Sequence, residues 1–149
     1  DAGSATNAPS EDYAGDPRPR GAGYDIGAYE YAQPTDCVSD ATTLCLSNSR
    51  FAVTVAWQTL DGRSGDGQAT ALTTDTGTFW FFNQENVELV LKVLDGRSIN
   101  DHFWVFFGAL SDVDYTVTVT DTETGAVKTY HNPQGQLASV GDTEAFYAP

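Results

Sequence analysis

Two clusters of aromatic residues break the polar–apolar alternation that a strand at a protein surface normally shows. They are Phe79-Trp80-Phe81-Phe82 and Phe103-Trp104-Val105-Phe106-Phe107. Successive side chains of a β-strand point to opposite faces, so a strand with either sequence is apolar on both faces. A sheet in a two-layer sandwich needs only one apolar face, because water can cover the other. The sequence therefore predicts that another segment, another copy of the chain or a ligand covers the outer face of these strands.

Short strand patterns recur along the second part of the chain and predict an all-β fold. Residues 51–57 alternate cleanly and place Phe51, Val53, Val55 and Trp57 on the face expected in the core. Further strands are expected at 69–73, 79–82, 87–94, 103–107, 115–120, 126–130 and 145–147, with a Gly- and Asp-rich loop at 61–67. No segment shows sustained helical periodicity. This pattern is typical of an antiparallel β-sandwich, Ig-like or jelly-roll-like.

Residues 1–36 differ from the predicted sandwich at 37–149. They hold four of the six prolines and are typical of an extended N-terminal arm. A tyrosine-rich segment at 24–31 is flanked by glycine and proline, and we expect it to form one strand. The residues expected to pair in this assembly arm are Tyr24, Ile26, Ala28, Tyr29 and Tyr31.

The chain is strongly acidic, with 21 acidic residues, seven basic residues and a net charge of −14 at pH 7. This charge repels nucleic acid and anionic membrane surfaces, and no basic cluster offsets it. No apolar run approaches the length that a membrane-spanning helix needs. We therefore expect no nucleic-acid partner and no membrane span.

Two cysteines, Cys37 and Cys45, lie eight positions apart at the start of the β-rich part. The pair could form a local disulfide, stay reduced, or contribute to a metal site. A zinc half-site usually has closer cysteines and needs more ligands. We expect the disulfide, which would place the protein outside the cytoplasm.

The sequence contains no recognisable catalytic or cofactor motif. His102 and His131 lie in no metal-spaced cluster, and serine has no suggestive histidine neighbour. Calcium could use loop carboxylates, but neither candidate pair has EF-hand spacing, namely Asp61 with Asp66 and Asp112 with Asp114. The string Leu-Asp-Gly-Arg-Ser occurs at 60–64 and 94–98, and its unmatched flanks indicate a recurring turn rather than a repeat. We expect no enzyme activity, no catalytic metal and no cofactor.

The three tryptophans support a second interpretation, because exposed rings on a sandwich face can bind sugars. Trp57 fits the inward face of its strand, whereas Trp80 and Trp104 have aromatic neighbours on both sides. At least one ring of each cluster should therefore lie on the outer face. Core or interface roles are expected for Phe79, Trp80, Phe81, Phe82, Phe103, Trp104, Phe106 and Phe107, with a sugar platform as the alternative.

Two parts of the chain resemble known families. Residues 18–30, with the sequence RPRGAGYDIGAYE, resemble the closing motif of secreted bacterial right-handed β-helix proteins of the choice-of-anchor type. The preceding coils are absent from the sequence, so the resemblance implies no lyase or glycan-cleaving activity. Residues 37–147 resemble a C-terminal module of secreted bacterial proteins, on the basis of Cys37, Cys45, Arg50-Phe51, Trp57, and the stretches at 75–82, 86–89, 92–96 and 103–105. This second resemblance implies an extracellular accessory domain without assigned activity.

These features predict an extracellular or cell-surface structural protein. The predicted sandwich has more apolar strand surface than one sheet face requires, and the arm offers a strand without a core of its own. We expect the arm to add a strand to a neighbouring copy, which gives a head-to-tail homo-oligomer or filament. The alternative is a carbohydrate-binding accessory module with a glycan partner.

Overall fold

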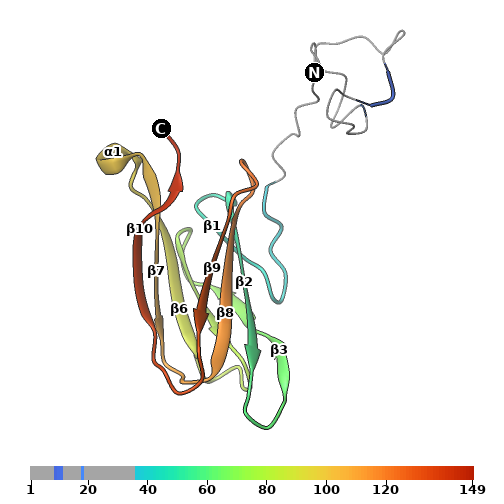
Figure 1. Cartoon of the computed structure of the whole chain (residues 1–149), viewed down its shortest axis with the longest axis vertical. Helices are drawn as coiled ribbons and strands as arrows, with labels where there is room; N and C mark the ends of the chain where they lie inside the picture. The colour runs from blue at the N-terminus through green and yellow to red at the C-terminus, as the bar shows by residue number, and fades with distance from the viewer. Residues whose placement is uncertain (1–8, 12–17, 19–35) are drawn as a thin grey trace. The chain divides into compact units, whose positions relative to one another are not determined.

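The structure is a computed structural model that describes residues 9–11, 18 and 36–149 (Figure 1). The chain divides into two units, Asp1–Thr35 and Asp36–Pro149. In the first unit, the backbone N–H of Arg18 donates to the carbonyl of Ser10 at 2.9 Å. The predicted arm strand at 24–31, including Tyr24, Ile26, Ala28, Tyr29 and Tyr31, lies outside the described residues.

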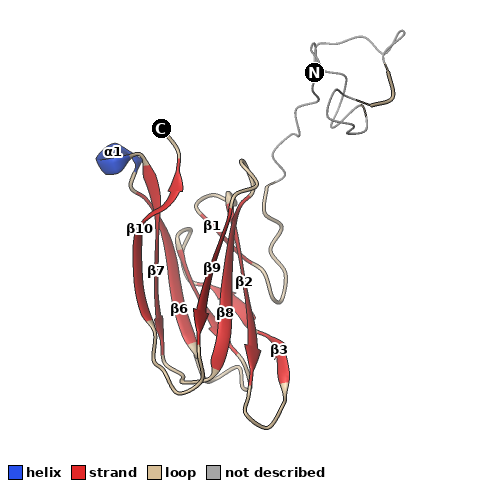
Figure 2. Cartoon of the chain, viewed as in Figure 1, coloured by secondary structure: helices blue, strands red, loops and turns tan. Residues whose placement is uncertain are grey.

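The second unit consists of two antiparallel sheets that pack face to face (Figure 2). The first sheet has the order β1 (Leu44–Leu46), β2 (Phe51–Gln58), β8 (Asp114–Asp121) and β9 (Val127–Asn132), and β3 (Ser64–Asp66) also pairs with β2. The second sheet has the order β10 (Ser139–Tyr147), β7 (His102–Ala109), β6 (Leu89–Asp95), β5 (Thr76–Trp80) and β4 (Gln68–Ala71). A single helical turn, α1 (Arg97–Asn100), connects β6 and β7. The predicted antiparallel β-sandwich is confirmed.

The core lies between the inner faces of the two sheets, as the alternating strand patterns require. In β2, Phe51, Val53 and Val55 are at most 1% exposed; they pack in the core with buried residues of the neighbouring strand β8 and of β6 and β7 in the opposite sheet. Trp57 also points inward, but it lies at the end of the core and remains partly exposed. Burial of these apolar side chains is the main favourable contribution to folding, at roughly 25 cal/mol per Å² of apolar surface.

The first aromatic cluster differs from the prediction of a strand that is apolar on both faces. β5 ends at Trp80, and the chain bends at the next two residues. Phe81 turns into the core and stacks on Trp57 with 6.0 Å between ring centroids. Phe82 packs edge-on against the same indole at 4.8 Å and stays 44% exposed. Phe79 and Phe81 are thus both buried as alternation requires, while the bend after Trp80 lets Phe82 pack against Trp57.

Two short strands, β1 and β3, lie where the sequence predicted none. β3 falls in the predicted loop at 61–67, because its backbone pairs with β2 although its residues favour turns. The N–H of Gly67 donates to the carbonyl of Val55 at 2.7 Å, at the point where the chain passes from the first sheet into the second. The following N–H of Ala69 donates to the carbonyl of Ala41 at 2.8 Å, which closes this side of the sandwich.

The predicted disulfide between Cys37 and Cys45 is present, and it attaches residue 37 to β1. The following turn between β1 and β2 is unusual, because Ser47, Asn48 and Ser49 all have positive φ values, from 51° to 66°. Non-glycine residues rarely adopt this left-handed conformation, and it persists only where surrounding contacts impose it. Here the N–H of Cys37 donates to the carbonyl of Ser49 at 2.7 Å, and the N–H of Ser47 donates to that of Thr74 at 2.7 Å.

Candidate binding surfaces

The outer face of the second sheet carries the outward rings of both aromatic clusters. In β7, Phe103, Val105 and Phe107 face the core, while Trp104 and Phe106 face outward. The turn that contains α1 covers Trp104. A Cβ on Gly96 would lie 2.1 Å from this indole, and the indole N–H donates to Oδ1 of Asn100 at 2.8 Å. Another segment of the same chain therefore covers part of the outer face, which is one of the three alternatives that the sequence left open.

The positions of this sheet that the regular strand register turns outward carry no carboxylate, although the irregular part of β10 between Asp142 and Phe146 contains the exposed Glu144. Phe106 lies over Gly141 on β10, and the Lys92 ammonium lies 5.4 Å from the centroid of the Phe106 ring. A shallow groove of about 270 Å³ runs beside this ring, and no atom lies within 4 Å of the position that a Cβ on Gly108 would occupy. The outward positions of the second sheet are Gln68, Thr70, Thr76, Thr78, Trp80, Val90, Lys92, Leu94, His102, Trp104, Phe106, Gly108, Ser139, Gly141 and Tyr147.

A second surface is the side of the sandwich where β9 and β10 form the edges of the two sheets. No backbone pairing joins β9 to β10 among the described residues. Side chains connect them instead: the Tyr130 hydroxyl donates to Oδ2 of Asp142 at 2.8 Å, and Lys128 Nζ lies 3.8 Å from the same oxygen. Burial and the bond to Asp142 both raise the pKa of Tyr130, so the hydroxyl keeps its proton. Because no backbone hydrogen bonds join β9 to β10, the outer edges of both strands offer unpaired backbone groups to solvent.

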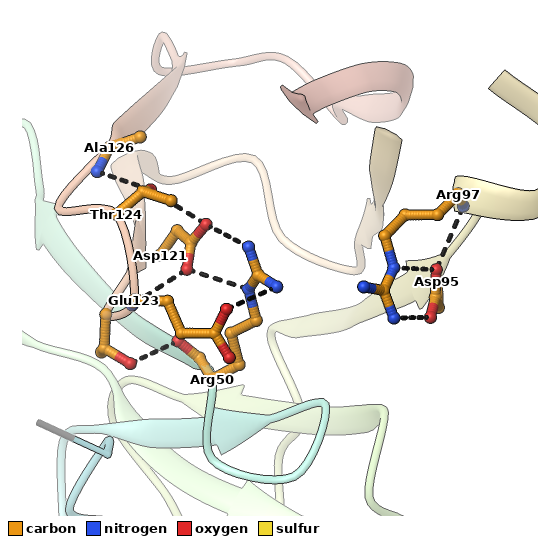
Figure 3. Close-up of polar contacts among 8 residues, drawn as sticks. Arg50, Asp95, Arg97, Asp121, Glu123, Thr124 and Ala126 are labelled. Carbon is orange, nitrogen blue, oxygen red and sulfur yellow. Dashed lines mark hydrogen bonds and ion pairs between the residues drawn. The ribbon is translucent and has the colours of Figure 1, made fainter. Parts of the chain in front are cut away.

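A third surface is a charged cleft of about 450 Å³ at the end of the sandwich that carries α1. Figure 3 shows its two arginines, each paired with a carboxylate. Arg50 is almost buried and makes a two-pronged pair with Asp121, at 3.0 Å from Nε and 2.8 Å from Nη2. Its Nη1 reaches Glu123 at 2.7 Å. The cleft is lined by Asp36, Ser47, Asn48, Arg50, Asp75, Asp95, Arg97, Phe103 and Glu123.

Burial and hydrogen bonding compete at Asp121, which is 1% exposed. Burial alone would raise its pKa, but hydrogen bonds from Arg50 and Thr124 lower the pKa below its ordinary value. Asp95 is more exposed, and hydrogen bonds from the side chain and backbone N–H of Arg97 lower its pKa to about 2. Both carboxylates are ionised at neutral pH, so the two guanidiniums are neutralised where they stand.

The two Leu-Asp-Gly-Arg-Ser segments have the same side-chain arrangement but different backbone conformations. In each, the arginine pairs with the aspartate two residues earlier, at 2.9 Å in Asp61–Arg63 and 2.7 Å in Asp95–Arg97. Each guanidinium also lies near a phenylalanine ring: Arg63 is 5.6 Å from Phe82, and Arg97 is 4.9 Å from Phe103. However, the glycine of the first string has φ = +84°, whereas that of the second has φ = −101°. The recurring element is thus an Asp-x-Arg clamp over an aromatic ring.

The residues considered for metal binding do not come together in the described part of the chain. No group of three or more histidine, cysteine, aspartate or glutamate side chains there is placed to hold a metal ion. Asp61 pairs with Arg63, and His131 Nε2 lies 3.2 Å from Asp114. Residues 36–149 and the short described stretches before them contain no helix long and apolar enough to cross a membrane.

Sequence reasoning missed the charged cleft, because its residues come from four separate turns, from β7 and from the segment before β1, and no local spacing marks them. It also could not identify the open edges, since edge position depends on strand order. A comparison of the chain with family models, curated proteins and solved structures found no match.

Proposed function

We propose that this chain is an extracellular, non-enzymatic structural module that associates with further copies through its N-terminal arm. The observation that carries this proposal is the unpaired edge of a sandwich whose opposite side is closed. An added strand satisfies the backbone groups of such an edge, and side-chain pockets then set its register. The disulfide is compatible with an oxidising compartment and supports the extracellular part of the proposal.

The arm is the segment of this chain best suited to pair with that edge. Its tyrosines at 24, 29 and 31 can bury ring surface while their hydroxyls remain hydrogen-bonded. An arm that docks on the next copy gives a head-to-tail contact, which can propagate into a filament. The aromatic strands support this proposal less strongly, because the turn that contains α1 covers Trp104.

Deletion of residues 1–35 tests the proposal. Among the described residues, the hydrophobic core cluster runs from Leu44 to Phe146, so the remaining sandwich should keep this core and its disulfide. We expect the full chain to form oligomers or filaments in light scattering and electron microscopy, and the shortened chain to stay folded and monomeric. A shortened chain that assembles as well as the full chain would contradict the role of the arm. A full chain that stays monomeric at high concentration would contradict self-association.

A glycan-binding function is the second candidate, supported by the aromatic face of the second sheet. Trp80 lies there opposite Gln68, with Thr70 on the same face of β4, and Phe106 lies two strands away beside the shallow groove; aromatic rings near amide and hydroxyl groups suit sugar rings and their hydroxyls. Affinity electrophoresis of the full chain in polysaccharide gels tests this candidate. We expect Phe106→Ala to abolish any retardation, and Ile99→Ala, which changes an exposed side chain on α1, to leave it unchanged.

A further inference from the structure

We infer that β9 is the edge that receives the arm segment 24–31 of another copy, with Val127, Thr129 and His131 supplying the main-chain partners. This inference rests on the proposed self-association and names the acceptor site. It is supported by the strand order, by which backbone groups of β9 point away from β8, and by the charges of β9 and segment 24–31.

The other three sheet edges are poor acceptors. β4 has four residues, and the N–H of its Ala69 is already bonded to Ala41. β1 and β3, which share the other edge of the first sheet, have three residues each. β10 is longer, but its register breaks between Asp142 and Phe146. Such a bulge twists an edge and hinders the pairing of a further strand. β9 pairs with β8 through all six of its residues without a break, so its outer edge is regular.

The alternation of hydrogen-bonded pairs between β8 and β9 shows which backbone N–H and C=O groups of β9 point away from β8. The N–H of Asp121 donates to the carbonyl of Ala126 at 2.9 Å, so this pair is hydrogen-bonded. Hydrogen-bonded and non-hydrogen-bonded pairs alternate along an antiparallel ladder. Lys128, Tyr130 and Asn132 therefore bond to β8, while the N–H and C=O groups of Val127, Thr129 and His131 face away from it. Three consecutive sets of donors and acceptors are available to an incoming strand.

Charge favours the arm over a second β9 as the occupant. β9 contains Lys128 and no carboxylate of its own, and the Lys128 ammonium lies 3.8 Å from its neighbour Asp142, whereas segment 24–31 contains Asp25 and Glu30 and no basic residue. Antiparallel pairing of two β9 strands would instead offer the Lys128 ammonium no additional carboxylate. Val127 and Thr129 are β-branched and exposed, and tyrosines opposite them would form favourable cross-strand pairs.

The experiment compares two proline variants of the full chain. Thr129→Pro removes an outward N–H and places a ring where the added strand must approach, while the bonds between β8 and β9 remain. Ser139→Pro is the matched control on β10: Ala138, the preceding residue, bonds to β7, so the N–H of Ser139 also points outward. We expect Thr129→Pro to weaken assembly at least about tenfold, as the loss of one or two hydrogen bonds implies, and Ser139→Pro to assemble like the unmodified chain.

Amide hydrogen exchange of the unmodified full chain gives a second measurement that needs no variant. We expect the β9 peptide to gain protection when the protein is concentrated enough to assemble, and the β10 peptide to show no gain. Assembly by Thr129→Pro at the unmodified level, or protection of β10 instead of β9, would overturn the inference. If arm deletion abolishes assembly while Thr129→Pro does not, self-association through the arm stands and β9 is the wrong acceptor. Protection of β9 that survives deletion of residues 1–35 would assign the edge to a second β9 and overturn the inference.

Discussion

The Arg50–Asp121 pair is the most buried charge contact in the described part of the chain, and it makes a testable contribution to stability. The Arg50 side chain is 12% exposed, and the substitution Asp121→Asn leaves it with only Glu123 as an ionic partner. We expect a loss of about 3 kcal/mol in the free energy of unfolding at neutral pH, the size usual for breaking a buried pair. Chemical denaturation measures this loss. Asp95→Asn is the matched control, because it breaks a similar two-pronged pair that is exposed, and it should change stability little.

The same pair predicts how stability changes with pH. The folded-state pKa of Asp121 is below its ordinary value of 3.8, so the ionised carboxylate stabilises the fold above that pH. This contribution is lost as the pH falls from about 4 through the folded-state pKa, because the folded and unfolded states then bind the same proton. The stability difference between the unmodified chain and Asp121→Asn should therefore shrink between about pH 4 and pH 2. A difference that stays constant over this range would show that the lost contact is not ionic.

Two glycines on the outer face of the second sheet should respond oppositely to alanine. At Gly96 the added Cβ would lie 2.1 Å from the Trp104 indole, so Gly96→Ala must displace the ring or the turn. Overpacking of this kind typically costs about 1–3 kcal/mol. At Gly108 no atom lies within 4 Å of the new Cβ, so Gly108→Ala should be neutral or slightly stabilising. Thermal unfolding of both variants, with tryptophan fluorescence to follow the indole, checks the pair.

At the scale of elements, the disulfide and the left-handed turn act as one unit. The bridge fixes Cys37, whose N–H in turn holds the carbonyl of Ser49. Its sequence separation of eight closes a short loop, for which the chain-entropy model gives roughly 2–3 kcal/mol. The double variant Cys37→Ser/Cys45→Ser should lose about that much stability and show faster amide exchange at 47–50. Exchange that is unchanged there would mean that the contact to Thr74 alone maintains the turn.

The sequence predicted well those strands in which apolar residues alternate with small or polar residues. β2 is the clearest case, since Phe51, Val53 and Val55 alternate with small or polar residues and all three are buried. β3 could not be predicted, because a Ser-Gly-Asp sequence becomes a strand only when β2 lies beside it. The end of β5 at Trp80 could not be predicted either, because Phe81 and Phe82 are aromatic like the residues before them and no turn residue marks the bend. The acceptor edge follows from strand order, which no local pattern encodes.

At the scale of the whole molecule, acidic charge opposes the association that the open edge permits. Each copy carries a net charge of −14, so copies repel one another over a distance set by the Debye length. The regular outward positions of the second sheet and the strand β9 carry no carboxylate, so we expect this repulsion to be weaker at these two surfaces. We therefore expect contacts between copies to form mainly at these two surfaces.

Salt should consequently promote assembly of this chain. The Debye length falls from about 30 Å at 0.01 M salt to about 10 Å at 0.1 M, which screens the repulsion between whole copies. The attraction of Lys128 for the acidic arm is also screened, but exposed ion pairs contribute little, so the long-range repulsion dominates. We expect the assembled fraction in sedimentation velocity to rise between these salt concentrations, and the chain lacking residues 1–35 to stay monomeric at both. Assembly that weakens with salt would show instead that local attraction between the arm and β9 outweighs the net charge.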